Sequence, residues 1–108
     1  MKVEVAKNFR RETKRLVKKY RSLAQEVADL ITNLPENPNQ GTPIGRDCYK
    51  IRLAIASKGK GKSGGGRVIT CVKVTAEIVT LLTIYDKSEQ EDIADNALTQ
   101  LLEDNDLL

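Results

Sequence analysis

Three neighbouring strands are predicted by the alternation of apolar and polar positions in the middle of the chain. In Tyr49–Ala56, the odd-numbered residues are Tyr, Ile, Leu and Ile and face one way, while Lys, Arg and two Ala face the other. A second strand is predicted over Arg67–Lys73, and a third over Ile78–Tyr85, which is almost entirely apolar or threonine. A strand that is apolar on both faces usually lies inside its sheet. These segments predict a three-stranded meander whose middle carries cations and no acids.

Two helices are predicted ahead of this meander. Apolar residues recur at i, i+4, i+7, i+8 and i+11 from Phe9 to Tyr20, and the same spacing returns from Leu23 to Leu34. Ser22 opens the capping-box pattern Ser-x-x-Gln, which places the start of the second helix near this residue. Two apolar stripes joined by a tight break predict a helical hairpin that lies on the sheet, with its lysines and arginines flanking the stripe.

The remaining segments complete the order of elements. Lys2–Val5 alternates and predicts a short strand, whereas Pro35–Gly45, with three prolines and two glycines, predicts a polar loop. A second capping-box pattern at Ser88-x-x-Glu91 precedes the apolar stripe of a last helix within Ala94–Leu102. The order β-α-α-β-β-β-α predicts an α+β fold, in which two N-terminal helices and a C-terminal helix pack on a small, mainly antiparallel sheet.

Length and composition predict one soluble domain. The whole chain, residues 1–108, is long enough for a single domain with a modest core. Charged residues make up 31% of it, and no apolar run approaches the roughly 18 residues of a membrane span. The start, Met1–Glu4, lacks the apolar core of a signal peptide, so a cytoplasmic protein is expected.

Charge is distributed very unevenly along the chain, although the net charge is only +3. Residues 1–21 and 46–73 each carry a net charge of +7, residues 22–45 carry −3, and residues 77–108 carry −8. This polarity suggests an anion-binding face and an acidic tail. For residues 1–21 the alternative, a basic helix that is simply solvated, stays open.

The two cysteines, Cys48 and Cys71, are expected several residues out of register when the first two strands of the meander pair across the loop between them. A disulfide requires close Cα atoms, so free thiols are predicted. A chain with two cysteines and no histidine offers few metal ligands, so neither a metal site nor a cofactor is expected.

A lysine- and glycine-rich loop, Ser57–Gly66, separates the first two strands of the meander. It contains the spacing Gly59-x-Gly61-x-x-Gly64 of a dinucleotide fingerprint and the triplet Gly61-Lys62-Ser63 of a P-loop, but both motifs must lead into a helix. A β-branched strand follows here, so both motifs are rejected. The loop is either a flexible hairpin or a phosphate-contacting one, and its three alternating lysines favour phosphate contact.

Candidate chemistry rests on cations, because the chain has no histidine and no nucleophile with a partner. Lys50 and Arg52 lie on the first strand of the meander, Arg67 opens the second, and Lys87 follows the third, with Tyr85 nearby. Arg67 shares a face with the first two if the strands pair with an odd sum of residue numbers. Repulsion within such a cluster makes a lysine lose its proton more readily, so it can act as a base while arginines hold phosphate. The alternative is a row of exposed cations that only keeps the protein soluble.

The segments Asp47–Arg52, Ser57–Ile69 and Leu81–Lys87 together resemble the RelE/ParE toxin superfamily. The glycine-lysine loop looks most like its HigB-type branch, and the order of elements agrees, so the resemblance spans nearly the whole chain. It implies a toxin of a type II toxin–antitoxin pair. Such toxins enter the ribosomal A site and cut translated messenger RNA as endoribonucleases, without a metal.

The resemblance also implies roles for individual residues. Lys50 and Arg52 match the basic strand that activates the ribose 2′-hydroxyl and steadies the phosphate. Arg67 matches the arginine that stabilises the charged transition state, and Lys87 lies near the position that assists the leaving oxygen. The 2′-oxygen would attack its own phosphodiester and leave a 2′,3′-cyclic end, while Tyr85 would either stack on a base or pack in the core. The lysines expected to contact ribosomal or messenger phosphates are Lys58, Lys60 and Lys62.

The chain departs from its relatives in two ways. HigB-type relatives often carry two tyrosines where Thr70 and Cys71 stand, and the predicted last helix has no aromatic residue. Two alternatives stay open, in which the chain is either a toxin that poisons DNA gyrase, as in the ParE branch, or a catalytically decayed toxin that only binds its antitoxin. The retained cations favour RNA cleavage over both. The implied partners are the ribosome, messenger RNA and an antitoxin with a helix-turn-helix domain; operator DNA would be bound only through the antitoxin, and no membrane contact is expected.

Overall fold

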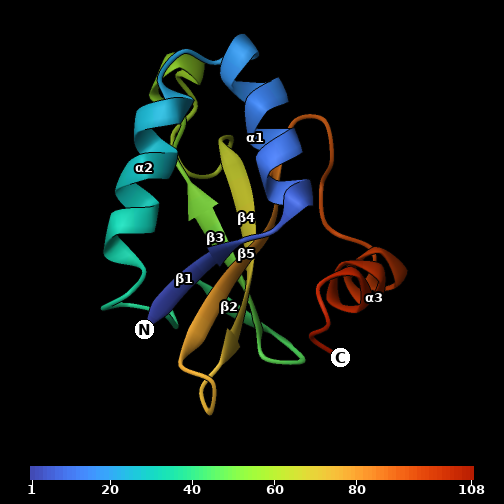
Figure 1. Cartoon of the computed structure of the whole chain (residues 1–108). Coiled ribbons are helices and arrows are strands. Elements are labelled where there is room, and N and C mark those ends of the chain that lie inside the picture. Colours follow the sequence, from blue (N-terminus) through green and yellow to red (C-terminus); the bar gives the residue numbers. More distant parts are fainter.

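The structure, a computed structural model, describes all 108 residues and contains three α-helices and one five-stranded sheet (Figure 1). The strands are β1 (Lys2–Val5), β2 (Thr42–Gly45), β3 (Cys48–Leu53), β4 (Gly66–Lys73) and β5 (Ile78–Asp86). The helices are α1 (Lys7–Lys19), α2 (Leu23–Asn33) and α3 (Asp95–Asp104), and a short 3-10 helix, η1, spans Ala56–Lys58. No helix has the length and apolar character needed to cross a bilayer.

The strands follow the order β1-β5-β4-β3-β2 across the sheet. β1 pairs with β5 in parallel, and all other neighbours are antiparallel. The predicted α+β fold and the meander of β3, β4 and β5 are therefore confirmed. β5, the strand predicted to be apolar on both faces, lies inside the sheet between β1 and β4.

The strand β2 is absent from the predicted order, because Pro35–Gly45 has the composition of a loop. Thr42 pairs with Lys50, and Pro43 continues the same antiparallel ladder. A proline cannot donate to a ladder but is tolerated in an edge strand, and β2 is the outer strand beside β3. This added strand places Thr42 next to the basic residues of β3.

The helical hairpin of α1 and α2 covers one face of the sheet. The core on this side contains 14 buried residues, including Phe9 and Leu16 from α1 and Leu23 from α2. Val68 of β4 and Ile84 of β5 meet them from the sheet. The apolar stripes predicted for the two helices form this core, while the lysines and arginines of α1 are exposed.

α3 packs on the opposite face around a smaller core of 8 buried residues. Leu98, Leu101 and Leu102 of this helix pack with Ile69 and Tyr85 of the strands. Figure 1 shows α3 (red) set apart from α1 and joined to β5 by a long connection. α3 has only 10 residues and leaves part of this face uncovered, and the basic residues of β3 and β4 lie there.

Neither predicted capping box forms. α2 begins where predicted, but the hydroxyl of Ser22 donates to Glu26 (3.0 Å) and lies 2.9 Å from the hydroxyl of Ser57. α3 begins well after the second pattern, and the hydroxyl of Ser88 donates to Asp86 (2.7 Å). The hydroxyl of Ser22 thus contacts the side chains of Glu26 and Ser57, and that of Ser88 contacts the preceding Asp86, so neither hydroxyl caps a helix N-terminus.

The pairing of β3 with β4 corrects the prediction for the cysteines. Cys48 is directly opposite Cys71. The reason is that β3 ends at Leu53 and not at Ala56 as predicted, which shifts the pairing of β3 with β4. The N–H of Val72 donates to the carbonyl of Asp47 (2.8 Å) beside this pair, so the cysteines form a non-hydrogen-bonded pair, in which side chains are closest. Both are free thiols that are buried in the core beneath α3.

Candidate active site

The register of the β3–β4 hairpin determines which cations share a face of the sheet. Arg52 is directly opposite Arg67, which is a pairing with the odd sum that the prediction required. Since side chains alternate along a strand, Lys50 lies on the same face as this pair. The structure therefore groups the three cations as predicted.

These residues line an open cavity of about 390 Å³, which we call the basic pocket. No hydrophobic residue contributes to its lining, and Lys87 joins the three strand cations from the segment after β5. Such a polar and cationic cavity suits a phosphate-bearing ligand better than an apolar one. The 7 residues that line the basic pocket are Thr42, Lys50, Arg52, Arg67, Lys87, Glu91 and Asp92.

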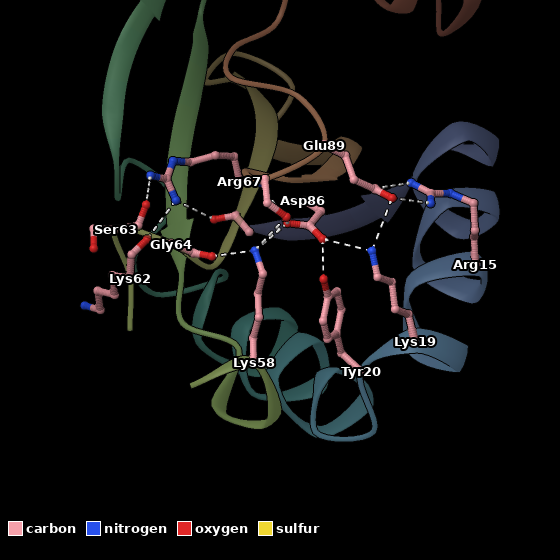
Figure 2. Close-up of polar contacts among 12 residues, drawn as sticks. Arg15, Lys19, Tyr20, Lys58, Lys62, Ser63, Gly64, Arg67, Asp86 and Glu89 are labelled. Carbon is pink, nitrogen blue, oxygen red and sulfur yellow. Dashed lines mark hydrogen bonds and ion pairs between the residues drawn. The ribbon is translucent and has the colours of Figure 1, made fainter. Parts of the chain in front are cut away.

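Arg67 is only 4% exposed, which contradicts the alternative of a row of exposed cations at this position. Its Nη1 donates to the carbonyl oxygens of Lys62 (2.8 Å) and Gly66 (2.9 Å), and its Nη2 donates to that of Ser63 (3.2 Å) (Figure 2). The glycine-rich loop therefore surrounds the guanidinium with its own carbonyl groups. A guanidinium has five N–H donors, so two of them have no acceptor in the protein and can bind a phosphate oxygen.

Two carboxylates from the connection between β5 and α3 border the basic pocket. Asp92 lies 3.1 Å from the Nζ of Lys50, and Glu91 lies 3.5 Å from the Nζ of Lys87. The backbone N–H of Ile93 and the ammonium of Lys50 hold the pKa of Asp92 below its usual value. The predicted site lacks these acids, because the capping-box pattern assigned their segment to a helix. The i,i+4 spacing of Lys87 and Glu91 is the one local signal for a contact.

The family model described as the RelE toxin of the RelE/RelB toxin–antitoxin system matches residues 1–105. The chain belongs to the RelE toxin family. The match includes every helix and strand, so the resemblance predicted from the sequence is confirmed for the whole fold. The narrower resemblance to the HigB-type branch stays a prediction.

Solved toxins share the fold of this RelE-family chain. A double arginine-to-alanine variant of the Escherichia coli toxin RelE in the free state matches with a TM-score of 0.61 and 16% identity, over 94% of each chain. The E. coli RelBE toxin–antitoxin complex gives 0.58 and 16%, over 79% of this chain and 94% of the other. A metal-bound toxin from Helicobacter pylori gives 0.52 and 18%, over 83% and 98%. At these identities, the likeness concerns the fold.

Arg52 is the least constrained cation in the basic pocket of this RelE-family toxin. Its side chain is exposed and has neither a carboxylate partner, as Lys50 and Lys87 have, nor the carbonyl partners of Arg67. Its side chain can therefore change conformation to contact a bound phosphate. No group of three or more His, Cys, Asp or Glu side chains is arranged to hold a metal ion.

Lys58, predicted to contact RNA phosphates, is instead held inside this RelE-family toxin, with 8% of its side chain exposed. Its Nζ donates to Asp86 (2.5 Å) and to the carbonyl oxygen of Gly64 (2.6 Å) (Figure 2). An ammonium that is buried against a carboxylate is not available to a ligand. Lys60 and Lys62 are exposed and stay candidates for phosphate contact.

Tyr85 lies in the core rather than in the lining of the basic pocket. Its exposed fraction is 4%, and it belongs to the cluster beneath α3. Burial, followed by the charge of Asp92, raises the pKa of Tyr85 to about 12, and its buried hydroxyl has no hydrogen-bond partner. Of the two roles that the sequence left open, core packing is the one that the structure shows, because a base needs an exposed ring face to stack on.

Proposed function

We propose that this chain is a toxin that cleaves translated messenger RNA on the ribosome, as an endoribonuclease. The observation that supports this function is the basic pocket, in which four cations from three parts of the chain surround one polar cavity. Membership of the RelE toxin family supports it as well. Cations in such an arrangement can hold a phosphodiester and stabilise the additional negative charge of its transition state.

The proposed reaction is an attack of the ribose 2′-oxygen on the adjacent phosphorus. Lys50, after its ammonium has released a proton to solvent, accepts the proton of the 2′-hydroxyl while the bond between phosphorus and the 5′-oxygen breaks. Lys87 gives a proton to the departing 5′-oxygen. Arg52 and the two unpaired N–H groups of Arg67 bind the non-bridging oxygens, where negative charge increases. The products are a 2′,3′-cyclic phosphate and a 5′-hydroxyl.

The surroundings of the pocket support a need for the ribosome. Glu91 and Asp92 lie beside the cations and repel an approaching phosphate. We therefore expect the pocket to act on RNA that is already positioned by contacts elsewhere. Exposed Lys60 and Lys62, together with the basic outer face of α1, are the candidates for contact with ribosomal phosphates.

A cell-free translation reaction with primer extension on the message tests this proposal. The protein should cut the message only while ribosomes translate it. Arg52→Ala should reduce cutting about 10²- to 10³-fold, which is the usual effect of removing one donor to a transition state. Lys73→Ala, which removes a cation at the far end of β4, is the matched control and should leave cutting unchanged.

Other results would redirect the assignment. Equal cutting of naked RNA would contradict the need for a ribosome. DNA damage with intact messages would identify a gyrase poison, and antitoxin binding without either effect would identify a decayed toxin.

We also propose that an antitoxin neutralises this chain. One of the solved E. coli relatives is a RelBE toxin–antitoxin complex. The basic pocket and the outer face of α1 both offer a cationic surface to an acidic antitoxin segment, and the antitoxin's predicted helix-turn-helix domain would supply operator binding. Pull-down with the product of the neighbouring gene, followed by amide hydrogen exchange, would map the contact. Protection confined to acidic α3 would refute the electrostatic argument.

A further inference from the structure

A buried carboxylate lies beside the basic pocket without lining it. Asp86, the last residue of β5, is fully buried. Its Oδ2 accepts a hydrogen bond from the hydroxyl of Tyr20 (2.5 Å), and its Oδ1 accepts one from the Nζ of Lys58 (2.5 Å) (Figure 2). The backbone N–H and the hydroxyl of Ser88 donate to the same Oδ1, at 2.9 and 2.7 Å. The end of α1, the short helix η1 and the segment after β5 thus converge on one side chain.

Lys58 connects Asp86 to the glycine-rich loop. The same Nζ that donates to the carboxylate also donates to the carbonyl oxygen of Gly64 (2.6 Å). The next residue, Gly65, accepts a hydrogen bond from the N–H of Lys87 (3.0 Å). A Cβ on Gly65 would lie only 2.2 Å from a backbone oxygen at the end of β3, so the loop is packed tightly against that strand. The position of this part of the loop is therefore fixed from two sides.

The loop in turn orients Arg67, because the carbonyl oxygens of Lys62 and Ser63 accept hydrogen bonds from its guanidinium. A path of direct contacts therefore runs from the buried carboxylate to a cation of the basic pocket. We propose that Asp86 is a positioning residue, which acts through Lys58 to hold the glycine-rich loop so that Arg67 faces the basic pocket. This inference rests on the proposed RNA cleavage.

A buried ion pair is by itself weak evidence for a gain in stability. The side chains of Asp86 and Lys58 are 0% and 8% exposed, so both charges lose most of their hydration. Replacing a buried ion pair by well-packed neutral groups is often neutral or even stabilising. The pair does join segments that are far apart in the sequence, which is a geometric role. A positioning role and a purely structural one predict different kinetic effects.

Asp86→Asn is the informative variant, because it keeps the size of the side chain and removes its charge. Tyr20→Phe is the matched control, since it removes another hydrogen bond to the same carboxylate without touching the loop. In the RNA-free protein, Asp86→Asn should accelerate amide hydrogen exchange at Gly64 and Gly65 about tenfold, while Tyr20→Phe should leave it close to wild type.

Kinetics on translating ribosomes supply the second measurement. At saturating ribosomes, Asp86→Asn should slow cleavage about tenfold to hundredfold, with the half-saturating ribosome concentration unchanged. Tyr20→Phe should lower the urea midpoint and keep the saturated rate. If Asp86→Asn does not fold, Lys58→Met removes the same contact from the side of the loop and is expected to give the same results.

Two results would overturn the positioning role. One is unchanged exchange in the loop of a folded Asp86→Asn or Lys58→Met variant. The other is an equal loss of saturated rate in Tyr20→Phe. If the wild-type protein cuts no RNA, the proposed function fails, and the exchange measurement by itself decides whether Asp86 holds the loop.

Discussion

Replacing Arg67 by alanine should destabilise the fold by several kcal/mol, whereas the same change at Arg52 should leave stability nearly unchanged. The two arginines are direct partners in adjacent strands and line the same pocket. Arg67 is 4% exposed and donates to three carbonyl oxygens, while Arg52 is exposed and has no such partner. The comparison therefore separates what a pocket cation contributes to folding from what it contributes to phosphate binding.

The expected magnitude follows from the hydrogen bonds that Arg67→Ala removes. A hydrogen bond to a charged group contributes about 1.5–3 kcal/mol, so three independent ones would contribute about 4.5–9 kcal/mol. These bonds share one guanidinium, and the carbonyl groups of Lys62 and Ser63 can turn to water once it is gone, so about 2–4 kcal/mol is expected. Relief of repulsion from Arg52 offsets a fraction of this loss. Arg52→Ala should change stability by less than about 0.5 kcal/mol.

Urea unfolding followed by circular dichroism measures both variants. With a denaturant slope of about 1.5 kcal/mol per M, Arg67→Ala should lower the midpoint by roughly 1–3 M. Arg67→Lys keeps the charge but offers a single ammonium in place of the planar guanidinium, so its urea midpoint should lie between those of wild type and Arg67→Ala. Equal midpoints for Arg67→Ala and Arg52→Ala would refute the reasoning, because the carbonyl groups of the loop would then contribute nothing.

The buried carboxylate of Asp86 should make the free energy of unfolding depend on pH in the acid range. Burial acts to raise its pKa, but hydrogen bonds, foremost from Lys58, outweigh burial and keep this pKa well below its usual value. The contribution is complete above the unfolded pKa of about 4 and is lost as pH falls toward the folded pKa, so urea midpoints should fall less steeply with acid in Asp86→Asn than in wild type. Combining Lys60→Ala with Lys62→Ala should keep the saturated cleavage rate and raise the half-saturating ribosome concentration. The slope of the logarithm of ribosome affinity against the logarithm of salt concentration should become shallower by about 1 to 2. Tyr85→Phe should keep both its urea midpoint and message cutting, because the hydroxyl that it removes is buried without a partner.

Opposite results are easily recognised for these variants. An acid profile that is as steep in Asp86→Asn as in wild type would mean that another group dominates acid unfolding. A slower saturated rate in the lysine double variant would assign the loop to chemistry rather than affinity. Loss of cutting in a folded Tyr85→Phe variant would return the tyrosine to the active centre.

Periodicity predicts most of the fold, because burial of one face imposes a repeat on each helix and strand. The stripe from Phe9 to Tyr20 and the alternation after Tyr49 are of this kind. Periodicity does not predict β2, because Pro43 and Gly45 are typical of a loop and this strand forms only through its pairing with β3. Its detection requires the tertiary structure.

The site was predictable as a group of residues but not in its surroundings. Alternation and one register suffice to place Arg52 opposite Arg67. Nothing local shows that Lys58 binds a carboxylate 28 residues further along the chain, or that a loop predicted to contact phosphates also holds Arg67. Burial of a charged side chain depends on partners that only the folded chain brings together.

The carboxylates of Glu91 and Asp92 act as tethered anions at two of the four cations in the basic pocket. A phosphate that binds Lys50 or Lys87 exchanges one anion for another, so fewer salt ions are released than the number of cations implies. Attachment to the same chain gives each carboxylate a high effective concentration, on the order of millimolar for a short flexible connection. A single free phosphate ion therefore competes poorly with the carboxylates of Glu91 and Asp92. A polynucleotide held at several points by the ribosome carries its own high effective concentration, and it can displace both carboxylates together.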